Sequence, residues 1–201
     1  MKRIVMMALL ALALPVAAFA GNVDFNNTGG TLAGTTSGLT LTGSMLTGVT
    51  GLGLGLCSTA TPCGSVSFST GALTSGNLTL GGTFSGIGSS FQILGNGTNG
   101  LPSVIFTGTF VGNINWSEQA CGAGECYTLQ GSISGTWYNG TTVGGATVQL
   151  TFNAGRDGFT GSVPLASGDT VITTVPEPGT LGLFGTGLVG LAGVLRKKFK
   201  A

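Results

Sequence analysis

The chain contains no histidine and very little charge. Without histidine it cannot form a Ser-His-Asp triad, a Cys-His nucleophile pair or a histidine-ligated metal site. Between Gly21 and Thr174 there is no lysine, and five acidic residues stand against Arg156 alone, a net charge of −4. Because binding to nucleic-acid phosphates requires basic side chains, this composition argues against a nucleic-acid partner.

Amphipathic helical periodicity is also absent between the two terminal segments. Threonine, glycine and serine dominate this part, and leucine, valine, isoleucine and phenylalanine recur among them at regular spacing. Turn-forming pairs such as Asn96-Gly97, Asn139-Gly140 and Asp157-Gly158 separate the apolar runs. The pattern predicts one folded β domain over residues 21–174.

Alternation of apolar and polar residues predicts which face of each strand is buried. One set of same-parity positions comprises Val104, Phe106, Phe110, Ile114 and Trp116, a second Tyr127, Leu129, Ile133 and Trp137, and a third Val148, Leu150 and Phe152. Threonine and serine are frequent on the opposite face. This indicates half-buried antiparallel strands, and we expect an all-β fold, an antiparallel β-sandwich or an incomplete barrel. A β-solenoid is the alternative, although the regularity fades before residue 77 and after residue 152.

A short motif, apolar-x-Gly-Thr-aromatic, occurs three times. It covers Leu80–Phe84, Phe106–Phe110 and Ile133–Trp137, and its glycines lie 26 and 27 residues apart. We expect each glycine on the inward face between two large side chains. There it bends the strand or lets a neighbouring aromatic ring cover its backbone.

The first 20 residues read as a signal peptide. Lys2 and Arg3 precede an apolar run, Ile4–Leu14, and the small residues Ala18 and Ala20 suit a cleavage that leaves Gly21 as the new N-terminus. We therefore expect an N-terminal signal-peptide helix over residues 1–20, with the export translocon and signal peptidase as partners. The mature chain then enters an oxidising compartment.

The last 27 residues fall into three zones. Val175, Pro176, Glu177 and Pro178 form an extended break, since proline disfavours helix in the residue before it. The uncharged segment 179–195 would span roughly 25 Å as a transmembrane helix, at ~1.5 Å per residue. The basic residues Arg196, Lys197, Lys198 and Lys200 follow and favour the cytoplasmic side of a membrane.

This order resembles the PEP-CTERM sorting signal, in which a Pro-Glu-Pro tripeptide, a short Gly/Leu-rich span and a basic terminus follow one another. The resemblance covers about 25 residues, 175–201, and an ordinary C-terminal anchor is the alternative. It implies sorting by exosortase, a membrane-embedded, transpeptidase-like cysteine enzyme thought to cut near the tripeptide. It also implies a Gram-negative bacterium, transient anchoring in the inner membrane and delivery to the outer surface or beyond, often alongside exopolysaccharide genes.

The four cysteines form two close pairs, Cys57 with Cys63 and Cys121 with Cys126. In an exported chain we expect two local disulfides, although four cysteines allow three connectivities. A four-thiolate zinc site is the alternative. We expect no metal and no cofactor.

Other groups suggest chemistry only weakly. Glu118 precedes the Cys121–Cys126 loop and Glu125 lies within it, and the two could act as a glycosidase-like acid pair. Asp24, Asn26, Asn27 and Asp157 could offer oxygens to calcium, but without a full loop spacing. Among the aromatic residues, Trp116, Tyr127 and Trp137 fall on the apolar face, and Tyr138 alone points to the polar side, where it could stack on a sugar.

Taken together, these residues predict an exported, exosortase-sorted protein of the bacterial surface or extracellular matrix. We expect it to have no catalytic residue and to associate with exopolysaccharide or biofilm. A secreted carbohydrate-binding module is the alternative, and a secreted glycan hydrolase that uses Glu118 or Glu125 is a further one.

Overall fold

A computed structural model describes residues 21–53, 57, 61–97, 100–120, 122, 125–153 and 159–174. Residues Gly21–Thr174 form one compact unit. The predicted signal-peptide helix, the predicted span 179–195 and the basic tail lie outside the described residues. The described part is built of strands, as follows: β1 Gly21–Thr28, β2 Thr31–Thr35, β3 Gly38–Thr50, β4 Gly64–Ser69, β5 Leu73–Asn77, β6 Gly81–Ser85, β7 Ser90–Gly95, β8 Val104–Ala120, β9 Glu125–Trp137, β10 Thr142–Asn153, β11 Ser162–Pro164 and β12 Ser167–Thr174.

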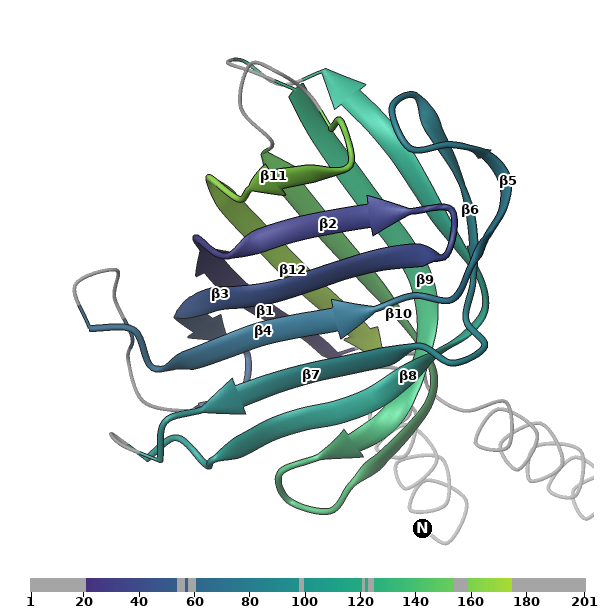
Figure 1. Cartoon of the computed structure of the whole chain (residues 1–201). Helices are drawn as coiled ribbons and strands as arrows, with labels where there is room; N and C mark the ends of the chain where they lie inside the picture. Colours follow the sequence, from purple (N-terminus) through teal and green to yellow (C-terminus); the bar gives the residue numbers. More distant parts are fainter. Residues whose placement is uncertain are drawn as a thin grey trace, which may run out of the picture. The chain divides into compact units, whose positions relative to one another are not determined.

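Eight of these strands form a closed antiparallel ring in the order β1-β12-β10-β9-β8-β7-β4-β3, and β3 pairs back onto β1. In Figure 1, β3, β4 and β7 lie in front of β1, β12 and β10, while β8 and β9 curve from one layer to the other. The prediction of an antiparallel all-β fold is confirmed. The expected sandwich or incomplete barrel is corrected to a complete barrel, because β1 bridges β12 and β3 and leaves no gap in the ring.

Glycine bulges bend the long strands so that the ring can close. The pairing register shifts within β3 at Gly43, within β8 at Gly112 and within β10 beside Gly145. Each of these glycines has a positive φ, near +70°, which other L-residues rarely adopt. A glycine bulge strengthens the local twist and turns the strand, as a closed barrel requires.

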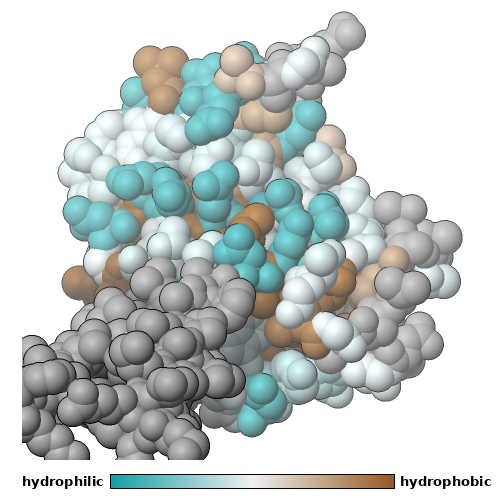
Figure 2. Space-filling model, turned by 180° about the vertical axis from the view of Figure 1, so that it is seen from behind, coloured by the Kyte–Doolittle hydropathy of each residue, from teal (hydrophilic) through white to brown (hydrophobic). Residues whose placement is uncertain are grey.

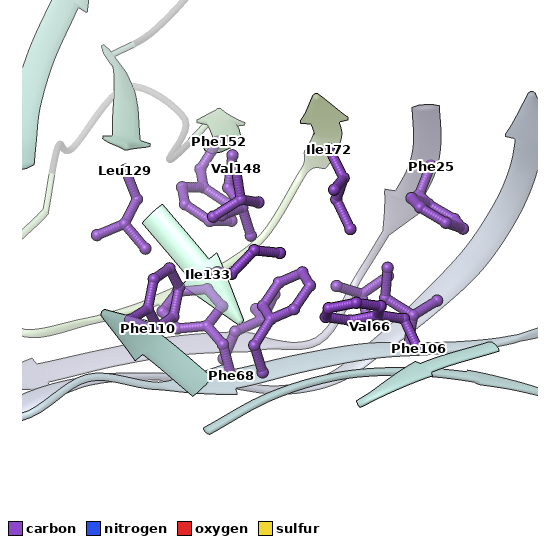
Figure 3. Packing of buried hydrophobic residues seen from close by; sticks show 14 of the residues in the cluster. Phe25, Val66, Phe68, Phe106, Phe110, Leu129, Ile133, Val148, Phe152 and Ile172 are labelled. Atoms are coloured by element: carbon purple, nitrogen blue, oxygen red, sulfur yellow. The ribbon is translucent and has the colours of Figure 1, made fainter. Parts of the chain in front are cut away.

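Aromatic rings in the barrel interior contact one another in a chain, and Figure 3 labels five of them, Phe25, Phe68, Phe106, Phe110 and Phe152. Neighbouring ring centroids lie 4.6–6.3 Å apart. In order, the chain runs Phe25, Trp137, Phe106, Phe91, Phe110, Phe68, Phe152 and Trp116, and Tyr127 and Phe159 close it at the far end. Burial of such large rings is the main apolar contribution to the fold.

Two of the three copies of the glycine motif lie on strands and have their glycine packed against the core, as predicted. Gly108 and Gly135 lie opposite each other on β8 and β9, and Phe106 covers both backbones. The first copy is a correction: Leu80 is 70% exposed and lies in the turn between β5 and β6, not on a strand. The Asn77 side chain accepts hydrogen bonds from the backbone N–H groups of Thr79 and Leu80, and this favours a turn over a continuous strand.

Two strand pairs lie outside the ring. β2 pairs with β3 and carries β11, whereas β6 pairs with β8 and carries β5. Within the described residues no helix is present that could cross a lipid bilayer.

Candidate functional site

The two ends of the β domain lie side by side. Gly21, the residue predicted to become the mature N-terminus, opposes Thr174 in the β1–β12 ladder. The Thr174 hydroxyl also donates a hydrogen bond to the Gly21 carbonyl oxygen at 3.2 Å. The predicted sorting residues Val175, Pro176, Glu177 and Pro178 follow directly in the chain. They, the basic residues 196–200 and the cleavage residues Ala18 and Ala20 lie outside the described residues.

Asp24 on β1 and Asp169 on β12 meet on the outer face of the same strand pair. Each lies between two buried, inward-facing neighbours, and the two carboxyl groups are close enough to influence each other's charge. Partial burial of Asp169, followed by its interaction with the neighbouring Asp24 carboxyl group, raises the pKa of Asp169 from 3.8 to about 6. Asp169 is therefore the group of this pair that holds its proton into mildly acidic solution.

The residues considered for calcium, Asp24, Asn26, Asn27 and Asp157, do not all face the same side of β1 where the structure describes them. Asp24 and Asn26 point outward, but their neighbour Asn27 points inward and donates to the Ser44 hydroxyl at 2.6 Å. Asp157 lies outside the described residues. Where the structure describes the chain, no cluster of three or more potential metal-binding acids, cysteines or histidines is found.

Glu118 and Glu125 come together at one end of the β8–β9 hairpin. Glu118 opposes Tyr127, and Glu125 lies two residues before Tyr127 on the neighbouring strand. The Tyr127 hydroxyl is 3.3 Å from a Glu125 carboxylate oxygen and accepts a hydrogen bond from the Phe159 N–H at 3.1 Å. Burial raises the pKa of Tyr127, and the two carboxylates raise it further. Glu118 is exposed and Glu125 is half-buried, so neither has the apolar enclosure of a glycosidase acid.

The aromatic residues considered for sugar stacking are mostly core residues. Trp116, Tyr127 and Trp137 are buried, as their strand parity predicts. The indole N–H of Trp116 donates to the Leu78 carbonyl oxygen at 2.8 Å, so its polar edge is used internally. Tyr138 is 43% exposed and is the one aromatic residue that the described surface presents.

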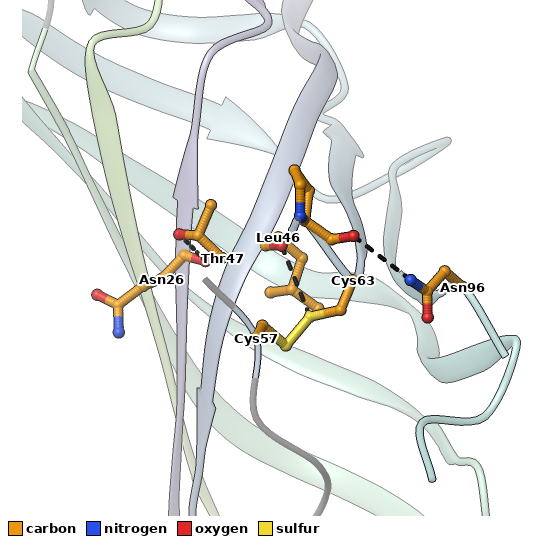
Figure 4. Close-up of a disulfide and its surroundings, with 7 residues drawn as sticks. Asn26, Leu46, Thr47, Cys57, Cys63 and Asn96 are labelled. Carbon is orange, nitrogen blue, oxygen red and sulfur yellow. Dashed lines mark hydrogen bonds between the residues drawn. A yellow bond between two sulfur atoms is a disulfide. The ribbon is translucent and has the colours of Figure 1, made fainter. Parts of the chain in front are cut away.

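The Cys57–Cys63 disulfide is present, as expected (Figure 4). Cys63 is buried, and its backbone N–H donates to the Leu46 carbonyl oxygen, so the loop is fastened to β3. Cys126 is also disulfide-bonded, whereas Cys121 lies outside the described residues. For Cys57 and Cys63 the thiolate zinc alternative is therefore wrong.

The outer face of the sheet carries amide and hydroxyl side chains in register. Gln149 on β10 opposes Gln130 on β9, which opposes Asn115 on β8. In the next row Asp169, Thr151, Thr128 and Ser117 follow one another across the same strands. Seen from behind, a band of hydrophilic side chains crosses this face (Figure 2). Such a face makes many hydrogen bonds but offers little charge.

Sequence reasoning missed the Asp24–Asp169 contact. Parity alone places each acid on an outward face, but the contact depends on the pairing of the first strand with the last. No short sequence pattern predicts how β1 and β12 are paired, because the two segments are separated in the sequence by most of the domain.

The geometry therefore defines an all-β barrel with a filled apolar interior, a polar outer face and adjacent ends. The end of β12 coincides with the start of a match to the PEP-CTERM protein-sorting motif, which covers residues 174–197. The chain thus carries a PEP-CTERM sorting motif, which marks it as an exported protein that is anchored in the membrane and then processed by exosortase. No curated protein and no solved structure matches the chain.

Proposed function

We propose that the protein is a non-catalytic component of the bacterial outer surface or extracellular matrix. The observation that carries this proposal is the position of the sorting motif. It begins at Thr174, the last residue of β12, so that a cut near Pro176–Pro178 releases the complete barrel. Such a cut would leave all the strands of the barrel in the exported product and remove the C-terminal segment. This outcome is expected for a protein that acts through its folded surface outside the cell.

The character of that surface supports a structural role. The in-register amides of Gln149, Gln130 and Asn115 offer donors and acceptors to water and to the hydroxyl groups of exopolysaccharide. Interaction of this kind needs no charge, in keeping with the low charge of the domain. The stacking platform of a typical carbohydrate-binding module would need more exposed aromatic surface than Tyr138 supplies.

Intact mass measurement on protein from the native host tests the processing. Membrane and secreted fractions are compared, and we expect a secreted species that starts at Gly21 and ends near Pro176–Pro178. A variant with Pro176→Ala, Glu177→Ala and Pro178→Ala should accumulate in the membrane fraction with an intact C-terminus. Thr180→Ser, just beyond the tripeptide, is the matched control and should be processed normally. Secreted protein that retains the full tail would contradict exosortase processing.

Co-sedimentation of the secreted protein with exopolysaccharide from the host tests the matrix role. We expect the wild type to pellet with the polymer and the Gln130→Ala, Gln149→Ala double variant to remain largely in solution. Glu118→Gln and Glu125→Gln should pellet like the wild type. Hydrolysis of the polymer that is lost in either glutamate variant would overturn the non-catalytic proposal.

A further inference from the structure

The β5–β6 hairpin presents an open strand edge. β6 pairs with β8, and β5 pairs only with β6, so among the described strands none lies beside the far side of β5 (Figure 1). The Leu73 N–H donates to the Thr36 carbonyl oxygen at 2.9 Å, which covers the first residue of this edge. The next four residues, Thr74–Asn77, are all exposed.

This edge lacks the charge and the proline by which proteins commonly prevent strand pairing, although β5 has only five residues and its register with β6 shifts once, between Leu73 and Ser75. Exposed edges are usually protected by charged side chains, by proline or by very short strands. The other strand pair outside the ring ends at β11, which has three residues and contains Pro164. In contrast, residues 71–89, which include the whole β5–β6 hairpin, contain no charged residue and no proline.

Two exposed apolar side chains lie at opposite ends of the hairpin, one in its turn and one after its last strand. Leu80, in the turn after β5, is 70% exposed, and Ile87, just after β6, is 87% exposed. They are the two most exposed large hydrophobic residues in the described part of the chain. The Asn77 side chain holds the turn and thereby keeps Leu80 at its tip. An open edge bordered by apolar side chains is a surface that a further strand can extend.

We propose that β5 pairs antiparallel with β5 of a second copy of this chain, so that the barrels associate through their hairpins. A strand edge in two-fold antiparallel pairing is complementary to itself, and the absence of charge means that two copies do not repel each other. Only about four residues are free to pair, and such a contact is weak in dilute solution. Anchoring at a membrane or accumulation in a matrix would supply the local concentration that it requires.

The inference is tested in the full chain, expressed in its host, by single cysteine substitutions. Thr74→Cys and Ser75→Cys sample the two side-chain orientations of β5, and Ser162→Cys on the protected edge β11 is the matched control. After mild oxidation, non-reducing gels should reveal a covalent dimer for position 74 or 75 at several times the control level. Equal yields for all three variants would overturn the proposal.

A second measurement does not depend on added cysteine. Sedimentation velocity of the secreted protein should detect a concentration-dependent dimer that Ser75→Lys removes and Ser162→Lys retains. Circular dichroism checks that both variants keep the β fold. Persistence of the dimer in Ser75→Lys would contradict pairing through β5. Neither result depends on polysaccharide binding, so this inference and the proposed matrix role can fail separately.

Discussion

The ring of Phe106 lies over the backbone of Gly135 on the neighbouring strand. A Cβ atom at Gly135 would be 2.6 Å from the Phe106 Cζ atom, a separation that side chains do not tolerate. The same ring restricts Gly108, directly opposite Gly135. Gly108 and Gly135 are therefore sites where an aromatic side chain packs on bare backbone.

Substitution of Gly135 by alanine should destabilise the barrel. The added methyl group forces the Phe106 ring or a strand to move, and overpacking of this kind costs about 1–3 kcal/mol of unfolding free energy. Urea denaturation measures the change. Gly144→Ala is the control, since a Cβ there meets nothing within 4 Å. A loss of equal size in both variants would refute the ring-on-glycine explanation.

Removal of the Tyr127 hydroxyl group should lower the free energy of unfolding, although the change removes only one oxygen atom. In Tyr127→Phe the buried N–H of Phe159 loses its acceptor, and an unsatisfied buried donor costs about 1–3 kcal/mol. The matched variant Tyr138→Phe changes an exposed hydroxyl and should leave the urea midpoint within experimental error. If Tyr127→Phe is as stable as the wild type, the Phe159 contact contributes nothing.

The Asp24–Asp169 pair should make stability depend on pH in the acidic range. Because the pKa of Asp169 is raised by folding, from 3.8 to about 6, the folded state holds more protons than the unfolded state in that interval. The contribution of this group to stability is therefore complete below about pH 4 and is lost as the pH rises through about 6.

Thermal unfolding of the wild type and of Asp169→Asn between pH 4 and pH 7 measures this effect. The variant should lose the decline in stability over this interval and should be the more stable protein at pH 7. Asp24→Asn should reduce this decline only in part, because burial, the largest cause of the raised pKa of Asp169, remains. An unchanged pH slope in Asp169→Asn would contradict the assignment to this pair.

Loss of the Cys57–Cys63 disulfide should lower stability moderately. The bond closes a loop with a sequence separation of 6, and the loop-closure estimate for so short a loop is about 2 kcal/mol. The Cys57→Ala, Cys63→Ala double variant isolates this bond from the one at Cys126, which a reducing agent would also break. Denaturation in urea should detect the loss, with secretion retained. A variant as stable as the wild type would indicate that the loop is already held by the contact of Cys63 with Leu46.

Strand parity predicts most of the core correctly. All the inward positions expected on β9 and β10 are buried, and so are Phe106, Phe110, Ile114 and Trp116 on β8. The parity persists across Gly112 because that bulge adds two residues relative to β9. Val104 is the exception. The register shifts between Ile93 and Leu94 of β7, opposite this end of β8, so Ile105 is buried and Val104 is 41% exposed.

The same physics explains why the N-terminal third looked irregular. The bulge at Gly43 adds one residue to β3, so the buried positions change from Leu39 and Leu41 to Ser44 and Leu46. A one-residue shift reverses the face of every later side chain and removes the alternation that parity analysis needs. Ring closure was not predictable either, because it depends on β1 pairing with both β12 and β3, a relation between distant segments.

The pairing of Gly21 with Thr174 places the two ends of the barrel domain next to each other. Because β1 and β12 are antiparallel, the first residue of the barrel and its last residue are paired at the same end of these two strands. Domains with adjacent ends tolerate circular permutation and insertion into other proteins. A short glycine linker from Thr174 to Gly21, with new ends opened at the Asn139-Gly140 turn between β9 and β10, should therefore preserve every strand pair. For the same reason, the predicted signal peptide or the C-terminal sorting motif could be replaced by another targeting segment, and we expect the barrel to keep its fold at the new location.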